Sequence, residues 1–200
     1  VQAIVPLVAL VLAGGVVAEE IDDRTITYLF TRPVPRASIL LGRWLASALP
    51  IVALVGLSSW AVIQLLGAAG SAERTAAWLP EGFPARLVVT VMMGAAVYSA
   101  VFAAAGALFR HPIIVGLAYT FVIEAFLGNL PGSNQKATIA FYLRSFLFAN
   151  DPQLGELREV IFNVPLVPAA AAVRALLLIL VAVLALGAWR FSRREYVLAA

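Results

Sequence analysis

The sequence predicts an all-α protein that crosses a membrane several times. Of its 200 residues, 62% are hydrophobic and only 12% are charged, and its mean hydropathy is +0.96. A soluble domain has about 25% charged residues, and so few charges cannot cover a surface that faces water. The apolar runs are continuous and rich in Ala and Leu, whereas strands of a membrane β-barrel alternate apolar and polar positions. The spanning segments are therefore expected to be helices.

Stretches with few or no charges locate five predicted spans. A helix rises 1.5 Å per residue, so about 20 apolar residues cross the roughly 30 Å of hydrocarbon in a bilayer. Within these stretches only Glu124 and Arg174 carry charge. The chain begins with Val, and its first apolar run lacks the basic start of a signal peptide, so we expect a missing upstream part with another helix. The predicted spans are residues 1–18, 44–68, 87–109, 112–130 and 170–189.

The basic residues predict the orientation of the chain in the membrane. Arg and Lys are denser in the segments 19–43, 110–111 and 190–200 than in 73–86 and 136–168. Because cytoplasmic loops carry the excess of basic residues, the first group and the C-terminus are expected in the cytoplasm. The net charge of +3 is small and scattered, which argues against a nucleic-acid partner.

The segment 19–43 predicts a short amphipathic helix on the cytoplasmic face. Four carboxylates come first and four arginines follow, an order that complements the helix dipole. Ile26, Leu29 and Phe30 fall on one apolar face, and Pro33 ends the helix. From these residues alone two interpretations stay open. The helix either rests among lipid headgroups or docks onto a cytoplasmic partner.

The order of residues within this segment also follows a recognisable pattern. An acidic residue precedes a Thr-Ile pair, and an apolar helix, an Arg-Pro-Val turn and a Leu-Gly-Arg entry to the next span follow. This order resembles the signature of bacterial ABC-2-type permease subunits, although Arg24 stands where many relatives have Gly. A second stretch, 110–131, is similar to the late helices of one bacterial branch. The matching residues of the first stretch are Glu20, Thr25, Ile26, Leu29, Arg32, Pro33, Val34, Arg36, Leu41, Gly42 and Arg43.

The resemblance implies a transport mechanism. It implies six spans in the intact subunit, pairing of two permease subunits as a homodimer or heterodimer, and a separate ABC ATPase subunit that binds ATP. Transport across the plasma membrane, outward rather than inward, is implied as well. The segment 19–43 would contain the coupling helix that docks on the ATPase. The residues implied in this coupling are Glu20, Thr25, Ile26, Leu29, Phe30, Arg32, Pro33, Arg36, Gly42 and Arg43.

Motifs for covalent chemistry are absent from the sequence. It has no phosphate-binding G-x-x-x-x-G-K-[ST] string, no H-E-x-x-H and no cysteine, and His111 is its only histidine. We therefore expect no metal or cofactor in this chain, and ATP hydrolysis in a partner. The alternatives to a transporter are a membrane scaffold that recruits a cytoplasmic partner and an intramembrane enzyme.

Glu124 is the most unusual residue of the predicted spans. An ionised carboxylate at that depth costs about 2.5–3.5 kcal/mol on insertion scales, so it should face protein or water. It either lies on the translocation path or pairs structurally, with Arg174 or with Tyr98, and the structural pairing is favoured. The outer segment 131–169 is expected to form short helices on the outer leaflet or an element partly buried between the spans.

Overall fold

The computed structural model describes residues 5–13, 36–68, 82–109, 111–130, 133–148 and 165–193. Every regular element in these ranges is a helix, which confirms the predicted all-α class. Three helices are long and apolar enough to cross a membrane, and they correspond to the second, third and fifth predicted spans. They cover Ser38–Leu66, Phe83–Leu108 and Ala169–Arg190.

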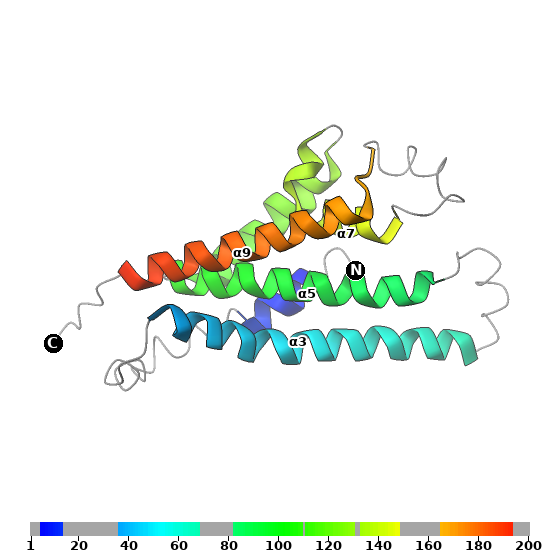
Figure 1. The fold of residues 1–200 in the computed structure, drawn as a ribbon, viewed down its shortest axis with the longest axis horizontal. Helices are drawn as coiled ribbons and strands as arrows, with labels where there is room; N and C mark the ends of the chain where they lie inside the picture. Colours follow the sequence, from blue (N-terminus) through cyan, green and yellow to red (C-terminus); the bar gives the residue numbers. More distant parts are fainter. Residues whose placement is uncertain are drawn as a thin grey trace.

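These three long helices lie side by side, with α5 between the other two (Figure 1). They are α3 (Arg36–Leu66), α5 (Phe83–Leu108) and α9 (Ala169–Arg193). α5 and α9 run in the same direction and α3 runs opposite to them (Figure 1). The start of α3 therefore lies at the same end of the bundle as the ends of α5 and α9. This is the end that the basic residues predict to be cytoplasmic.

α3 starts earlier than the predicted span. The span is predicted from residue 44, within a helix that the sequence expects to be capped at Ser38. The helix begins at Arg36 and runs without a break for 31 residues. That length is about 46 Å, well beyond the roughly 30 Å of the hydrocarbon core. Residues 36–43 are thus the first two turns of the spanning helix. Pro50 lies inside the helix on an exposed face.

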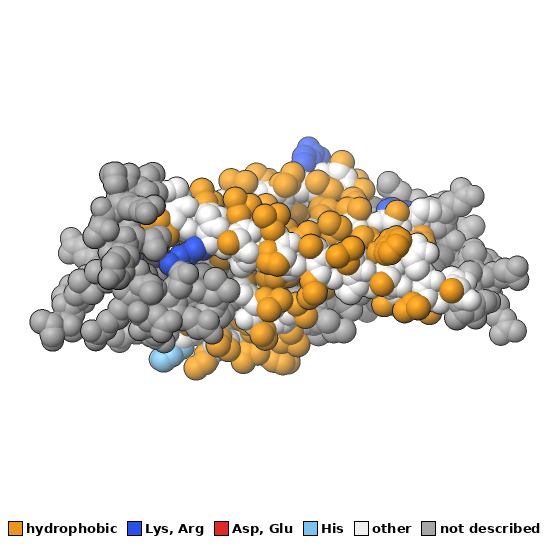
Figure 2. Space-filling view, turned by 90° about the horizontal axis from the view of Figure 1, so that it is seen from below, with side chains coloured by type: hydrophobic (Ala, Val, Ile, Leu, Met, Phe, Trp, Pro, Cys, Tyr) orange, Lys and Arg blue, Asp and Glu red, His pale blue; other side chains and the backbone are white. Residues whose placement is uncertain are grey.

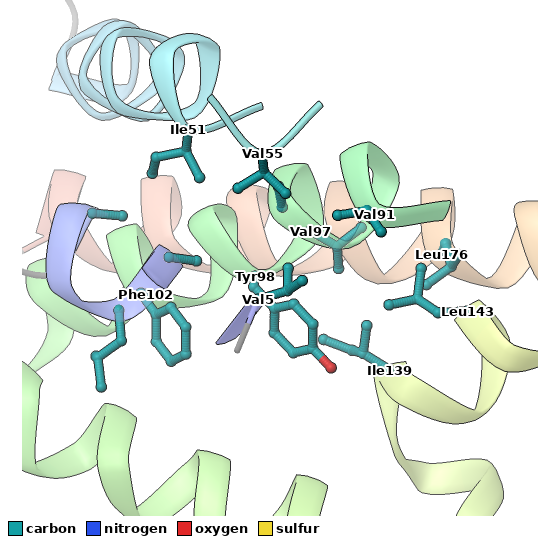
Figure 3. Close-up of a cluster of buried hydrophobic side chains, with 14 residues drawn as sticks. Val5, Ile51, Val55, Val91, Val97, Tyr98, Phe102, Ile139, Leu143 and Leu176 are labelled. Atoms are coloured by element: carbon teal, nitrogen blue, oxygen red, sulfur yellow. The ribbon is translucent and has the colours of Figure 1, made fainter. Parts of the chain in front are cut away.

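The hydrophobic core is built around α5. Its small side chains between Gly94 and Ala107 are almost all buried and let the neighbouring helices approach closely. Tyr98 and Phe102 of α5 are stacked, with ring centroids 6.4 Å apart. Figure 3 shows the side chains that surround them: Val5, Ile51, Val55, Val91, Val97, Ile139, Leu143 and Leu176.

The helical residues 5–13 are the described part of the first predicted span. Val5, Ala9 and Leu10 contribute to the core. Leu10 contacts the chain where Gly116 lies, and a Cβ at Gly116 would collide with Leu10 and lie 3.2 Å from Phe102. A residue without a side chain is therefore needed at this crossing.

The fourth predicted span, 112–130, is helical but irregular. It begins as the α-helix α6 (Pro112–Ala118), continues as the π-helix η2 (Tyr119–Phe126) and ends as the 3₁₀-helix η3 (Leu127–Asn129). The Thr120 hydroxyl donates to the Gly116 carbonyl at 2.9 Å, where the α winding gives way. A hydroxyl bound there perturbs the regular helix ladder. The apolar part, Pro112–Phe126, is shorter than the three long spans and leans away from them (Figure 1).

The outer segment is described in two parts, 133–148 and 165–168. It contains the short 3₁₀-helix η4 (Ser133–Ala137) and the α-helix α7 (Ile139–Phe148). α7 contacts both α5 and α9. Its residues Ile139, Leu143 and Leu147 are buried along one face, so α7 is packed onto the bundle.

Candidate functional site

Only some of the residues predicted to carry function can be placed in the structure. Glu20, Thr25, Ile26, Leu29, Phe30, Arg32 and Pro33 lie outside the described residues, so their role in coupling stays a prediction. Arg36, Gly42 and Arg43 are described as parts of α3. Gly42 is exposed and has open space where a Cβ would lie, so packing does not require a glycine there.

The Glu124 carboxylate is the centre of a buried polar cluster. Its side chain is 1% exposed, and it accepts three hydrogen bonds from described residues. The Tyr119 hydroxyl and the Ile139 backbone N–H both donate to Oε1 at 2.9 Å. The Ala140 backbone N–H donates to Oε2 at 3.1 Å. Two segments that are fifteen residues apart in sequence are thereby joined.

These bonds make Glu124 a cap for the N-terminus of α7. Ile139 and Ala140 are its first two residues, and the first N–H groups of a helix have no partner within the helix. The Thr138 hydroxyl accepts from the Phe141 N–H at 3.2 Å and donates to the Gln135 carbonyl at 2.8 Å. A negative charge at this end also complements the helix dipole. The carboxylate and the hydroxyl together hold the first turn of α7.

The predicted pairing of Glu124 with Arg174 is not seen among the described residues. Arg174 is exposed, and its Nε donates to the Ala170 carbonyl one turn back on its own helix, at 3.3 Å. Tyr98, the other predicted partner, is buried and reaches from α5 toward Ile139 at the start of α7 (Figure 3). Its hydroxyl makes no hydrogen bond to the described residues, but it interacts electrostatically with the Glu124 carboxylate. Backbone N–H groups and Tyr119 satisfy the carboxylate instead.

A different arginine, Arg144, interacts with Glu124 in place of the predicted Arg174. It lies on α7, one turn beyond Ala140, and its side chain is partly exposed. Burial lowers the pKa of the Arg144 guanidinium from its ordinary value, and the negative charge of Glu124 opposes this change. Glu124 and Arg144 therefore interact electrostatically within one cluster.

A cavity of about 240 Å³ lies beside this cluster, between α5 and α7. Its walls are mostly apolar, and its polar lining comes from Thr90, Tyr98 and Arg144. Within the described ranges, no group of three His, Cys, Asp or Glu side chains is placed to hold a metal ion.

The sequence reasoning missed Tyr119, Thr138 and Arg144 as members of this cluster. A local signal was present for Thr138, because a threonine before an apolar run is a common helix cap. The five-residue spacing from Tyr119 to Glu124 does not follow the three- or four-residue periodicity of an α-helix. The π winding of η2 explains their contact, because a π-helix brings residues that are five apart close together.

Comparison with known proteins bears on the chain as a whole. A family model described as ABC-2 family transporter protein matches residues 1–196. Neither the curated proteins nor the solved structures gave a match to the chain. Because the family match covers nearly the whole sequence, the chain belongs to the ABC-2 transporter family, and the predicted identity is confirmed.

Proposed function

We propose that this member of the ABC-2 family is the permease subunit of an ATP-driven exporter. In this proposal a separate ABC ATPase subunit binds and hydrolyses ATP, and the permease conducts the substrate across the plasma membrane of a bacterium. The family match over residues 1–196 is the observation that carries it. Two permease subunits pair in the assembly, with their C-termini in the cytoplasm.

The surface of the bundle supports a membrane setting. The outer faces of α3 and α9 carry large apolar side chains that are more than half exposed, among them Leu57, Trp60 and Leu178. Figure 2 shows a broad hydrophobic surface on the side where α3 lies. Such a surface is unfavourable in water and suits lipid or a second subunit.

The continuity of α3 supports the proposed coupling. The predicted coupling segment ends within residues 36–43, and these residues form the first two turns of a spanning helix. A helix transmits displacement along its axis, whereas a Gly/Ser-rich linker would absorb it. A push from the ATPase that reaches Arg36 would therefore pass along α3 into the membrane.

The proposal is tested by changing the apolar face of the predicted coupling helix. We expect Leu29→Asp with Phe30→Asp to abolish transport-coupled ATP hydrolysis while the protein still inserts into the membrane. The matched control is Thr27→Asp with Thr31→Asp, because the helical pattern places these residues off the apolar face. The protein is purified together with the ABC ATPase that associates with it, and ATP hydrolysis and transport are measured in proteoliposomes.

The outcomes of this experiment separate the functions. Normal coupled turnover in the Leu29/Phe30 variant would overturn the coupling assignment. Co-purification of a partner without ATPase activity would instead support a scaffold, and turnover by the isolated chain would support an enzyme.

A further inference from the structure

We propose that the cavity between α5 and α7 binds a single-chain amphiphile with an anionic head, its head on Arg144 and its chain between the two helices. The inference rests on the proposed function only where it places the cavity at a certain depth in the membrane. The cavity itself is defined by described residues of α5, α7 and the segment 5–13.

The lining of the cavity separates into an apolar interior and a charged entrance. Of the ten described residues that line it, only Arg144 and Phe148 are partly exposed, and the other eight are buried. The cavity is therefore reached past an arginine and an aromatic ring. Among the buried residues, Val91, Gly94 and Leu143 offer no hydrogen-bonding side chain, whereas Thr90 and Tyr98 each carry a hydroxyl. This arrangement matches a molecule with one polar end and one hydrocarbon end.

The size of the cavity restricts the chain that it can hold. Pockets for drug-sized ligands are usually about 300–1,000 Å³, whereas an engineered apolar cavity of about 150 Å³ in another protein holds one benzene molecule. At about 240 Å³, this cavity has room for one short or partly inserted hydrocarbon chain.

The charge at the entrance selects the head of the amphiphile. Arg144 is the only charged residue among the described residues that line the cavity. Glu124 interacts with it electrostatically, but that carboxylate already accepts three hydrogen bonds and is not part of the lining. An arginine fork binds a phosphate or carboxylate through charge-assisted hydrogen bonds. It would repel a quaternary ammonium head.

The position of the cavity fits a ligand from the outer leaflet. Thr90 lies seven residues into α5, about 10 Å from its start, and Phe148 packs on Phe83 with ring centroids 5.9 Å apart. The proposed orientation places this end of α5 on the outer side of the membrane. A phosphate head at Arg144 would then lie nearer the outer surface than the hydrocarbon midplane.

The test measures binding of octyl phosphate, octanol and octyltrimethylammonium to the intact protein. Native mass spectrometry in a neutral detergent counts bound molecules, and a titration gives apparent affinities. We expect one octyl phosphate per chain, bound at least about tenfold more tightly than octyltrimethylammonium, because a hydrogen bond to a charged group is worth that much. Octanol should bind with intermediate affinity.

Three variants locate the site. Arg144→Gln should remove most of the preference for the anionic head, and Arg144→Lys should restore part of it. Gly94→Val should weaken binding of all three probes, because a Cβ at Gly94 lies 3.0 Å from Leu143 Cδ1 and 3.6 Å from Val5 Cγ1. The matched control is Arg174→Gln, which removes an exposed arginine outside the cavity and should bind as the wild type does.

Two further measurements identify the source of the amphiphile. A lipid that stays bound through purification, at the Arg144 site, identifies a membrane lipid as the occupant. Concentration-dependent stimulation of the partner's ATP hydrolysis by octyl phosphate, lost in Arg144→Gln, identifies a transported molecule.

Equal binding of the anionic and cationic probes, or an anion preference unchanged in Arg144→Gln, would overturn the inference. Should Arg144→Gln not fold, Arg144→Lys and Gly94→Val decide the question alone. If no ATPase associates with the protein but it still binds the anionic probe preferentially, the proposed function is refuted and the cavity assignment stands.

Discussion

α5 and α3 have similar hydropathy and contact each other along the bundle, but they occupy different environments. In the most apolar stretch of α5, 61% of the residues are buried, against 17% in α3. Hydropathy therefore identifies both helices as spans without distinguishing the central one. The sizes of their side chains make that distinction.

The central position of α5 follows from its small residues. Between Gly94 and Ala107 it carries mostly Ala, Gly and Ser, and these let other helices pack against its backbone. α3 instead presents Leu, Val and Trp outward on its exposed face. In a membrane, large apolar side chains face lipid at little cost, whereas close packing between helices needs small ones. Interior and periphery should accordingly differ in their sensitivity to mutation.

The largest effect is expected at the buried cap of α7. Glu124→Leu leaves two buried backbone N–H groups and the Tyr119 hydroxyl without their acceptor. We expect a loss of about 3 kcal/mol or more in the free energy of unfolding, and a smaller loss for Glu124→Gln, which keeps one acceptor oxygen. Reversible unfolding of the protein in mixed micelles measures both values. Equal stability of the Leu variant and the wild type would contradict the role of Glu124 as a cap.

A smaller effect is expected from the aromatic core of α5. Phe102→Ala removes a fully buried ring that stacks on Tyr98 and meets Tyr119 edge-on, with centroids 6.2 Å apart. We expect a loss of roughly 2–3 kcal/mol, somewhat below the value in soluble proteins because the unfolded ring transfers to lipid or detergent.

The matched change on the periphery is Trp60→Ala on α3, where the side chain is 55% exposed. It should cost less than about 0.5 kcal/mol in the same unfolding experiment. A cost as large as that of Phe102→Ala would show that a partner covers this face of α3 and would remove the contrast between the two helices.

The smallest effects compare one buried hydroxyl with one exposed charge. Tyr119→Phe deletes a single hydrogen bond to Glu124 and should cost about 1 kcal/mol. Arg174→Gln should change stability by less than about 0.5 kcal/mol, because its side chain bonds only to its own helix among the described residues. A larger loss for Arg174→Gln than for Tyr119→Phe would revive the predicted pairing of Arg174 with Glu124.

The sequence was sufficient to predict the helical class and the three long spans, because charge-free stretches of that length have few other uses. The predicted span boundary at residue 44 marks where the charged residues end, and the helix that contains the span begins earlier, at Arg36.

The site was predicted in part for a similar reason. The cost of an ionised carboxylate in lipid predicted that Glu124 would be held by protein, and it is buried. Its partners were missed because two of them are backbone N–H groups of a helix fifteen residues further along the chain. Arg174 was predicted as a partner of Glu124 because it carries the opposite charge. Leu29 and Phe30 lie outside the described residues, so the coupling face stays a prediction.

The unbroken course of α3 from Arg36 to Leu66 also limits how the chain can change in length. One residue inserted after Arg43 would rotate every preceding residue by about 100° around the helix axis and shift it by about 1.5 Å. The face that the predicted cytoplasmic end of the helix presents to a neighbour would then be lost, even though no side chain had been altered. Insertion of a whole number of turns would preserve that face and merely lengthen the rod. The helical register of this part of the protein is thus constrained, as well as the type of residue at each position.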